Sequence, residues 1–186
     1  MTEFDVVLVG VDGSDVARAA LVFAAHEADR RGARLTVAHA CRASEHVQTD
    51  TQVHPFAQIV RAEAAATLAA IHPRLAYQII QRDTGASELL VELSATADVL
   101  VVGTHRSGQL RGFVLGSVSQ RVAAHAACPV VTISGPPEHD DGPIVLGASA
   151  SAGGVAALRF ACREAELRHV PVRAIRSLTT EDWALS

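Results

Sequence analysis

Short apolar runs alternate with helix-forming segments along the chain, and this alternation limits the possible folds more than any other feature. The apolar runs span residues 5–11, 34–40, 75–81, 98–103 and 128–134. Helical periodicity fills residues 14–31, 55–71, 84–97 and 117–126 between them. No two neighbouring runs are joined by a hairpin turn, and parallel strands need helical crossovers. We therefore predict an α/β fold with an open parallel sheet and helices on both faces.

Each helical segment has an apolar stripe that we expect to face the sheet. The first stripe contains Ala17, Ala20, Leu21, Ala24, Ala25 and Ala28. The second contains Ile59, Ala62, Ala66, Ala69 and Ala70, and the third contains Leu89, Leu90 and Leu93. Ser14 and Thr84 have the side chains that cap helix starts, so we expect them to cap the first and third segments.

Composition and charge narrow the class of partner. Hydrophobic residues make up 49% of the chain and aromatic residues 4%, which suits a buried sheet under alanine-rich helices. Few aromatic rings and a net charge of −4 argue against a nucleic acid or an anionic membrane as a partner. The start is acidic, no segment approaches the ~18 apolar residues of a membrane helix, and the cysteines Cys41, Cys128 and Cys162 are isolated. We expect reduced, mostly buried thiols and a cytoplasmic location.

A partial internal repeat follows a linker. Residues 135–143 are rich in proline, glycine and acidic residues, and residues 144–150 then resemble residues 7–13. With Gly10 placed on Gly147, the repeat aligns Ser14 with Ser151, Glu27 with Glu164, and Arg31 with Arg168. We predict a domain over 1–134, a linker over 135–143 and a βαβ fragment over 144–186. The fragment has Ser149 in place of Asp12 and lacks a phosphate loop, so we expect it to pack on its own domain or on a partner subunit.

The stretch GTHRSGQLRGFVLGS, residues 103–117, connects the fourth apolar run to a helix. A helix start presents unpaired N–H groups and partial positive charge, and glycine lets the backbone approach an anion closely. Ser117 adds a hydroxyl donor, and the loop carries two arginines and a histidine but no carboxylate. The pattern is typical of a phosphate-binding loop, although glycine-rich turns between strands and helices also occur for geometric reasons alone.

Two further segments make the whole pattern resemble the universal stress protein family. The family motif is glycine, two residues, glycine, nine residues, glycine, then serine or threonine, and it falls here on Gly103, position 106 and Gly116-Ser117. The opening DVVLVGVDGSDVARAAL and the segment VLGSVSQRVAAHAACPVVTI resemble the family's first and last units. The resemblance covers residues 2–134 and, with the partial repeat, suggests a tandem-type member with an incomplete second copy. It implies a Rossmann-like five-stranded sheet of strand order 3-2-1-4-5.

The resemblance also implies an adenine nucleotide, with ATP as the expected cofactor and any Mg²⁺ brought by the triphosphate. Asp12 would meet the ribose or adenine side. The base pocket would be lined by Gly10, Val11, Ala40 and Val102. The ribose and phosphates would be surrounded by Gly103, Gly116, Ser117 and Val118. Asp12 has an alternative role as a turn residue that bonds to its own backbone.

Arg106 departs from the family motif, because it stands where the second glycine is expected. Its side chain could crowd the triphosphate, or its guanidinium could pair with phosphate oxygens in place of backbone contacts. We include Arg106 among the expected nucleotide-binding residues.

We therefore predict a stress-response regulator whose bound nucleotide alters its conformation or its dimerisation, and not an enzyme. Family members commonly dimerise through the last strand, here residues 129–133, and we expect a homodimer. Two alternatives are a dimeric scaffold that binds no nucleotide and a weak ATP hydrolase. No nucleophile-elbow pattern supports catalysis.

Overall fold

The computed structural model describes residues 5–41, 55–104, 116–135 and 142–176. These residues belong to two compact units, Met1–Pro137 and Glu138–Ser186. The first unit contains a five-stranded sheet and the second a two-stranded sheet. The division of the chain into a functional domain, a linker and a fragment stays a prediction.

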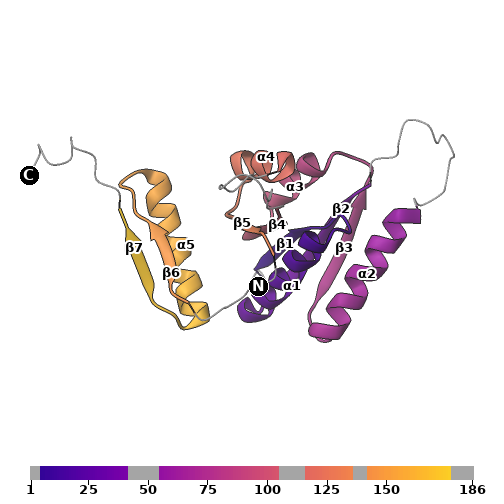
Figure 1. Ribbon diagram of the computed structural model, residues 1–186, viewed down its shortest axis with the longest axis horizontal. Helices are drawn as coiled ribbons and strands as arrows, with labels where there is room; N and C mark the ends of the chain where they lie inside the picture. Colours follow the sequence, from indigo (N-terminus) through magenta and orange to yellow (C-terminus); the bar gives the residue numbers. More distant parts are fainter. Residues whose placement is uncertain (1–4, 42–54, 105–115, 136–141, 177–186) are drawn as a thin grey trace, which may run out of the picture. The chain divides into compact units, whose positions relative to one another are not determined.

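The first unit has three layers, with its sheet in the order β3-β2-β1-β4-β5 and all neighbouring strands parallel. Its strands are β1 (Val6–Gly10), β2 (Arg34–Ala40), β3 (Tyr77–Arg82), β4 (Val99–Gly103) and β5 (Val130–Ile133). Its helices are α1 (Asp15–Arg31), α2 (Pro55–Ile71), α3 (Ala86–Ser94) and α4 (Ser117–His125). Helices α1 and α2 cover one face of the sheet, and α3 and α4 cover the other (Figure 1). The predicted fold class and strand order are confirmed.

The predicted capping residue is confirmed for α1 and wrong for α3. Ser14 caps α1, and its Oγ accepts a hydrogen bond from the Ala17 N–H at 3.2 Å. The prediction that Thr84 caps α3 is wrong, because Gly85 occupies the N-cap position and makes no side-chain bond. The Thr84 hydroxyl instead donates to the Glu88 carboxylate at 3.0 Å. The third and fifth strands also begin about two residues later than the sequence predicts.

Helix α2 faces the sheet with a different side from the one predicted. Its buried residues are Ala57, Val60, Ala64 and Leu68. The expected inward residues are exposed: Ile59 is 52% exposed, and Ala62, Ala66, Ala69 and Ala70 also face solvent. The helix is apolar on two sides, so periodicity alone does not select the buried one. The buried side carries Leu68 and Val60, which remove more apolar surface from water than alanines do.

A buried ion pair holds the last turns of α1. The Arg31 Nε donates to a Glu27 carboxylate oxygen at 2.5 Å, and both side chains are at least 98% buried. Arg30 lies 3.5 Å from the other Glu27 oxygen. Two charges removed from water are stable only when they are paired, so the two residues depend on each other.

We expect Arg31→Leu to lower the free energy of unfolding by about 2 kcal/mol, because the buried Glu27 carboxylate then loses its 2.5 Å contact with the Arg31 guanidinium. Urea denaturation followed by circular dichroism measures this change. The double variant Glu27→Leu/Arg31→Leu is the control and should recover most of the loss. Equal stability of the single variant and the wild type would contradict the assigned role.

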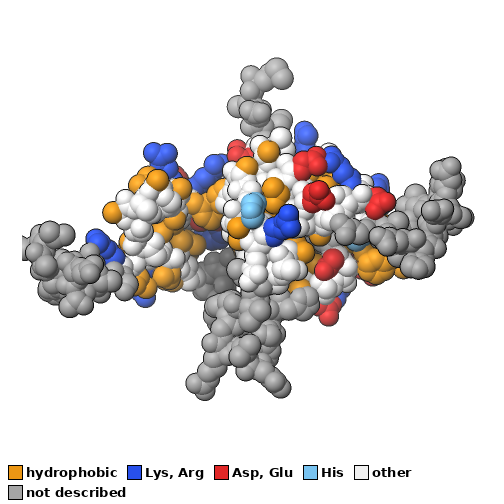
Figure 2. All heavy atoms as spheres, turned by 90° about the horizontal axis from the view of Figure 1, so that it is seen from above, with side chains coloured by type: hydrophobic (Ala, Val, Ile, Leu, Met, Phe, Trp, Pro, Cys, Tyr) orange, Lys and Arg blue, Asp and Glu red, His pale blue; other side chains and the backbone are white. Residues whose placement is uncertain are grey.

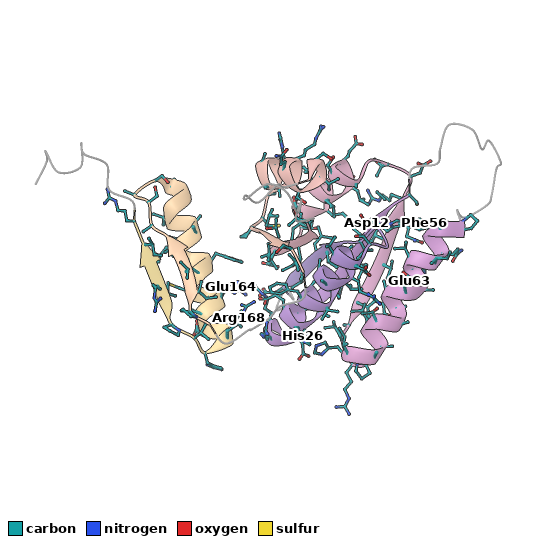
Figure 3. All side chains as sticks on the ribbon, in the orientation of Figure 1. Asp12, His26, Phe56, Glu63, Glu164 and Arg168 are labelled. Atoms are coloured by element: carbon teal, nitrogen blue, oxygen red, sulfur yellow. The ribbon has the colours of Figure 1, made fainter. Side chains whose placement is uncertain are left out.

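The second unit repeats the local structure of β1, α1 and β2. It consists of β6 (Ile144–Gly147), α5 (Ala152–Arg168) and β7 (Val172–Ile175), with β6 and β7 parallel. Ser151 caps α5 as Ser14 caps α1, and His169 takes the left-handed conformation that Gly32 takes after α1. Glu164 and Arg168 form the same buried pair as Glu27 and Arg31 (Figure 3). The sequence alignment of the repeat therefore corresponds to equivalent structural positions.

Candidate functional site

The predicted site lies at the carboxyl edge of the sheet, between β1 and β4. The chain crosses from β1 to β2 in one direction and from β4 to β5 in the other, so the winding direction of the sheet reverses there. Val9 pairs with Val37 on one side and with Val101 on the other, so the ends of β2, β1 and β4 meet there. A cavity of about 200 Å³ opens at this edge. It brings together nine predicted residues: Gly10, Val11, Asp12, Ala40, Val102, Gly103, Gly116, Ser117 and Val118. Arg106, the tenth, lies outside the described residues, as does His105.

Asp12 projects from the turn between β1 and α1 (Figure 3). Its Oδ1 accepts hydrogen bonds from the Ser14 N–H at 3.0 Å and from the Ser14 hydroxyl at 2.6 Å. The alternative role of a turn residue therefore applies to this oxygen. Oδ2 makes no hydrogen bond with any described residue and remains available to a hydroxyl or amino donor. Asp12 can hold the turn and meet a ligand at the same time.

The glycines of the motif serve two different needs. A Cβ on Gly103 would lie 2.8 Å from the carbonyl carbon and oxygen of Val16, so the close approach of α1 requires glycine there. A Cβ on Gly116 would meet no atom of the described residues within 4 Å, and its φ of −62° is open to any residue. Packing thus explains Gly103, whereas neither backbone conformation nor packing against the described residues explains Gly116. A ligand that approaches the backbone closely would account for the second glycine.

The start of α4 is the most electropositive backbone feature of the cavity. No side chain of the described residues caps it, and its first turn contains no acidic residue. By contrast, Asp15 lies in the first turn of α1 and Glu88 in that of α3. The first N–H groups of α4 have no acceptor within the helix, so they and the Ser117 hydroxyl are suited to an anion. The buried Ser119 hydroxyl is already used, because it donates to the Gly103 carbonyl at 3.2 Å.

The cavity is also lined by residues that the sequence did not assign to the site, and the leucines among them form an apolar wall. The missed lining residues are Ser14, Val16, Ala17, Ala38, Ala86, Leu89, Leu90, Thr104 and Ser119. Leu89 and Leu90 are buried and pack with Val102 and Ala38. Helix α3 follows β3, and β3 lies two positions from β1 in the sheet. A local sequence pattern therefore does not place these leucines at the site, whereas the strand order does. The cavity thus combines a flat apolar wall with polar main-chain donors.

Other titratable groups are placed for structural roles. His39 lies in β2 and is buried, and its Nδ1 lies 2.8 Å from the Val11 carbonyl oxygen. Its Nε2 has no hydrogen-bond partner among the described residues.

In the described part of the chain, no group of three or more His, Cys, Asp or Glu side chains is arranged to hold a metal ion. Among the described residues, no helix is long and apolar enough to cross a bilayer.

The expectation that the thiols are mostly buried is wrong, because Cys41 and Cys128 are half-buried and Cys162 is exposed. Burial raises the pKa of Cys128 to about 11, and the nearby Asp98 carboxylate adds to this rise. A raised pKa lowers the thiolate fraction, so we expect iodoacetamide to label Cys128 far more slowly than Cys162 at pH 8. Its labelling rate should increase roughly tenfold per pH unit below pH 9. Peptide mass spectrometry measures both rates, and equal rates at pH 8 would contradict this assignment.

Comparison with known proteins identifies the class to which this fold and cavity belong. The sequence profile of the universal stress protein family matches residues 3–134. The chain therefore belongs to the universal stress protein family.

Two relatives illustrate how the match extends. A universal stress protein of Mycobacterium tuberculosis is 31% identical over 195 residues, which cover 95% of this chain and 64% of that protein. A universal stress protein of Thermus aquaticus is 36% identical over 141 residues, which cover 70% of this chain and 98% of that protein. The chain thus spans less than two thirds of the length of the mycobacterial relative.

Solved structures agree with the fold. A universal stress protein from Archaeoglobus fulgidus superposes with a TM-score of 0.59 at 23% identity and covers 71% of this chain and 100% of its own. A universal stress protein solved in complex with cAMP is 28% identical, with a TM-score of 0.53, and covers 72% of this chain and 98% of its own.

Proposed function

We propose that this universal stress protein binds an adenine nucleotide in the cavity between β1, β4 and α4. The observation that carries the proposal is that no described residue fills the space at Gly116, caps the start of α4 or bonds to Oδ2 of Asp12. The complex of the 28% identical relative with cAMP supports an adenine nucleotide as the ligand. ATP remains the ligand that we expect.

The lining residues fit the parts of a nucleotide. The apolar wall of Ala38, Ala40, Leu90 and Val102 is suited to a base, which would displace water from it. Asp12 Oδ2 would accept from a ribose hydroxyl. The main-chain amides at the start of α4 and the Ser117 hydroxyl would donate to phosphate oxygens. Any Mg²⁺ would enter with a triphosphate.

We propose that the nucleotide regulates the protein and is not consumed as fuel. Its site touches the starts of three helices, α1, α3 and α4, so binding could alter their relative positions. Among the described strands, β5 pairs only with β4, which supports the proposed homodimer through residues 129–133. On the face shown in Figure 2, acidic and basic side chains of the described residues are interspersed and form no continuous basic stripe. We propose a cytoplasmic location for this regulator.

Equilibrium dialysis of the full chain against labelled ATP tests the proposal. We expect one saturable site per chain, with a dissociation constant below about 100 μM. Unlabelled AMP or cAMP should compete if the adenosine part provides most of the recognition. Absence of saturable binding would favour the scaffold that acts by dimerisation alone. Phosphate release in proportion to protein would favour the weak hydrolase.

We expect Asp12→Asn to weaken ATP binding about tenfold, because an amide in place of the free carboxylate oxygen loses a charge-assisted hydrogen bond with the ribose. The substitution retains the oxygen that accepts from Ser14, so the turn should persist. Dialysis gives the affinity, and thermal denaturation without nucleotide provides the control for folding. An unchanged affinity would assign Asp12 to the turn alone.

A further inference from the structure

A second cavity, of about 310 Å³, lies between α1 and α2. It shares Val11, Ser14 and Ala17 with the proposed nucleotide cavity, so one wall separates the two. None of the predicted nucleotide residues other than Val11 lines it. The family motif therefore does not account for this cavity.

The inner part of the second cavity is apolar. Val11, Ala17, Leu21, Val60 and Ala64 line it, and all five are buried. Ala17 on α1 and Ala64 on α2 are small, and small side chains between two helices leave space that no protein atom fills. An apolar molecule placed there would recover the missing contacts. The volume is at the lower end for ligand sites and corresponds to a small molecule.

Charged side chains line the mouth of the cavity, and one of their negative charges is not paired with any described residue. Three charged residues line it: Asp15, Arg18 and Glu63. Arg18 lies 3.3 Å from the Asp15 carboxylate, so these two charges form a pair. Glu63, which Figure 3 labels on α2, makes no hydrogen bond or ion pair with any described residue. One carboxylate thus remains to receive a cation.

An anion is disfavoured at the same place. The Ser14 hydroxyl already accepts the Ala17 N–H, and the Ser14 carbonyl accepts the Arg18 N–H. The start of α1 therefore offers fewer donors than the uncapped start of α4, and Asp15 adds negative charge to it.

We propose that the cavity between α1 and α2 binds a small organic amine, with its apolar body against the five buried residues and its ammonium group beside Glu63. The charge of the mouth and the apolar depth together define this class of ligand. The proposal does not depend on nucleotide binding.

Because the two cavities share a wall, an amine bound in the second cavity would affect the first one. Ser14 lines both cavities, and its hydroxyl donates to Asp12 Oδ1 at 2.6 Å. An amine that shifts Ser14 would shift the Asp12 carboxylate with it. Where the proposed nucleotide site is also correct, each ligand must change the affinity of the other by the same factor.

Titration of the ¹⁵N-labelled full chain without nucleotide tests the proposal with three probes of similar size. These are 2-phenylethylamine, the neutral 2-phenylethanol and the anionic 3-phenylpropionate. We expect the amine to produce saturable amide shifts at Leu21, Val60 and Ala64, with an affinity at least about fivefold higher than that of either other probe. Saturation by the carboxylate at equal or lower concentration would overturn the assigned charge. No saturable shift by the amine up to 10 mM, as an order-of-magnitude limit, would overturn the site.

Two variants and a control locate the amine. Glu63→Gln should lower amine affinity about fivefold and leave the affinity for 2-phenylethanol unchanged. Glu166→Gln makes the same charge change in the second unit and should have no effect on either probe. Ala64→Met should fill the cavity and abolish the shifts, while an unchanged spectrum elsewhere shows that the fold is retained. Unaltered amine affinity in both Glu63→Gln and Ala64→Met would contradict the proposal, and ATP dialysis of the wild type reports separately on the first cavity.

Discussion

Gly116→Val is expected to weaken ATP binding by about 3 kcal/mol, or roughly a hundredfold, without unfolding the protein. The valine side chain would occupy the space through which an anion reaches the first amides of α4. A loss of two or three charge-assisted hydrogen bonds accounts for the size of the effect. The fold should tolerate the change, because φ and ψ at Gly116 are −62° and 162°, in the extended region.

Equilibrium dialysis measures the loss of ATP affinity in Gly116→Val, and thermal denaturation of the same preparation checks that the variant stays folded. Gly135→Val is a matched control, since a Cβ there also meets no atom of the described residues within 4 Å and Gly135 does not line the cavity. We expect the control to bind ATP as the wild type does. Similar affinities for Gly116→Val and the wild type would show that phosphate does not approach this glycine.

Gly103→Ala is expected to act on stability and to lower the free energy of unfolding by about 3 kcal/mol. The new Cβ would lie 2.8 Å from the Val16 carbonyl carbon and 3.0 Å from the Ala17 nitrogen. These are backbone atoms of the first turn of α1, which cannot move aside as the end of a flexible side chain can. The clash should displace α1 from β4 and lower the melting temperature by about 10 °C.

Thermal denaturation followed by circular dichroism measures this loss, with no nucleotide present. Gly116→Ala is the control, because its methyl group enters open space and should leave the melting temperature within about 2 °C of the wild type. A Gly103→Ala protein as stable as this control would mean that α1 does not pack against the end of β4 as described.

The contrast between these glycines shows what the sequence can and cannot predict. The motif places Gly103 and Gly116 at the ends of a strand and a helix, and the structure brings both to one cavity. Only Gly103 lies against the backbone of α1, and α1 is far from both glycines in the sequence. A local sequence pattern therefore cannot predict that the two positions require glycine for different reasons.

The strand order follows from the alternation of elements and the family resemblance, since parallel connections leave few topologies. By contrast, α2 carries apolar residues on two sides, and only packing on α1 and β2 decides that Val60 and Leu68 are buried. The sequence also leaves two roles open for Asp12, a turn residue and a ligand contact. The structure assigns one carboxylate oxygen to the turn.

The central claim is that main-chain amides at the start of α4 hold the anionic part of an adenine nucleotide. Titration of the ¹⁵N-labelled full chain with ATP tests it most directly, with the amides of Ser117 and Val118 as reporters. The account predicts saturable downfield shifts at these two amides, and much smaller ones with adenosine, which lacks phosphate. Saturable ATP binding that leaves both amides unshifted, or equal shifts with adenosine, would contradict it.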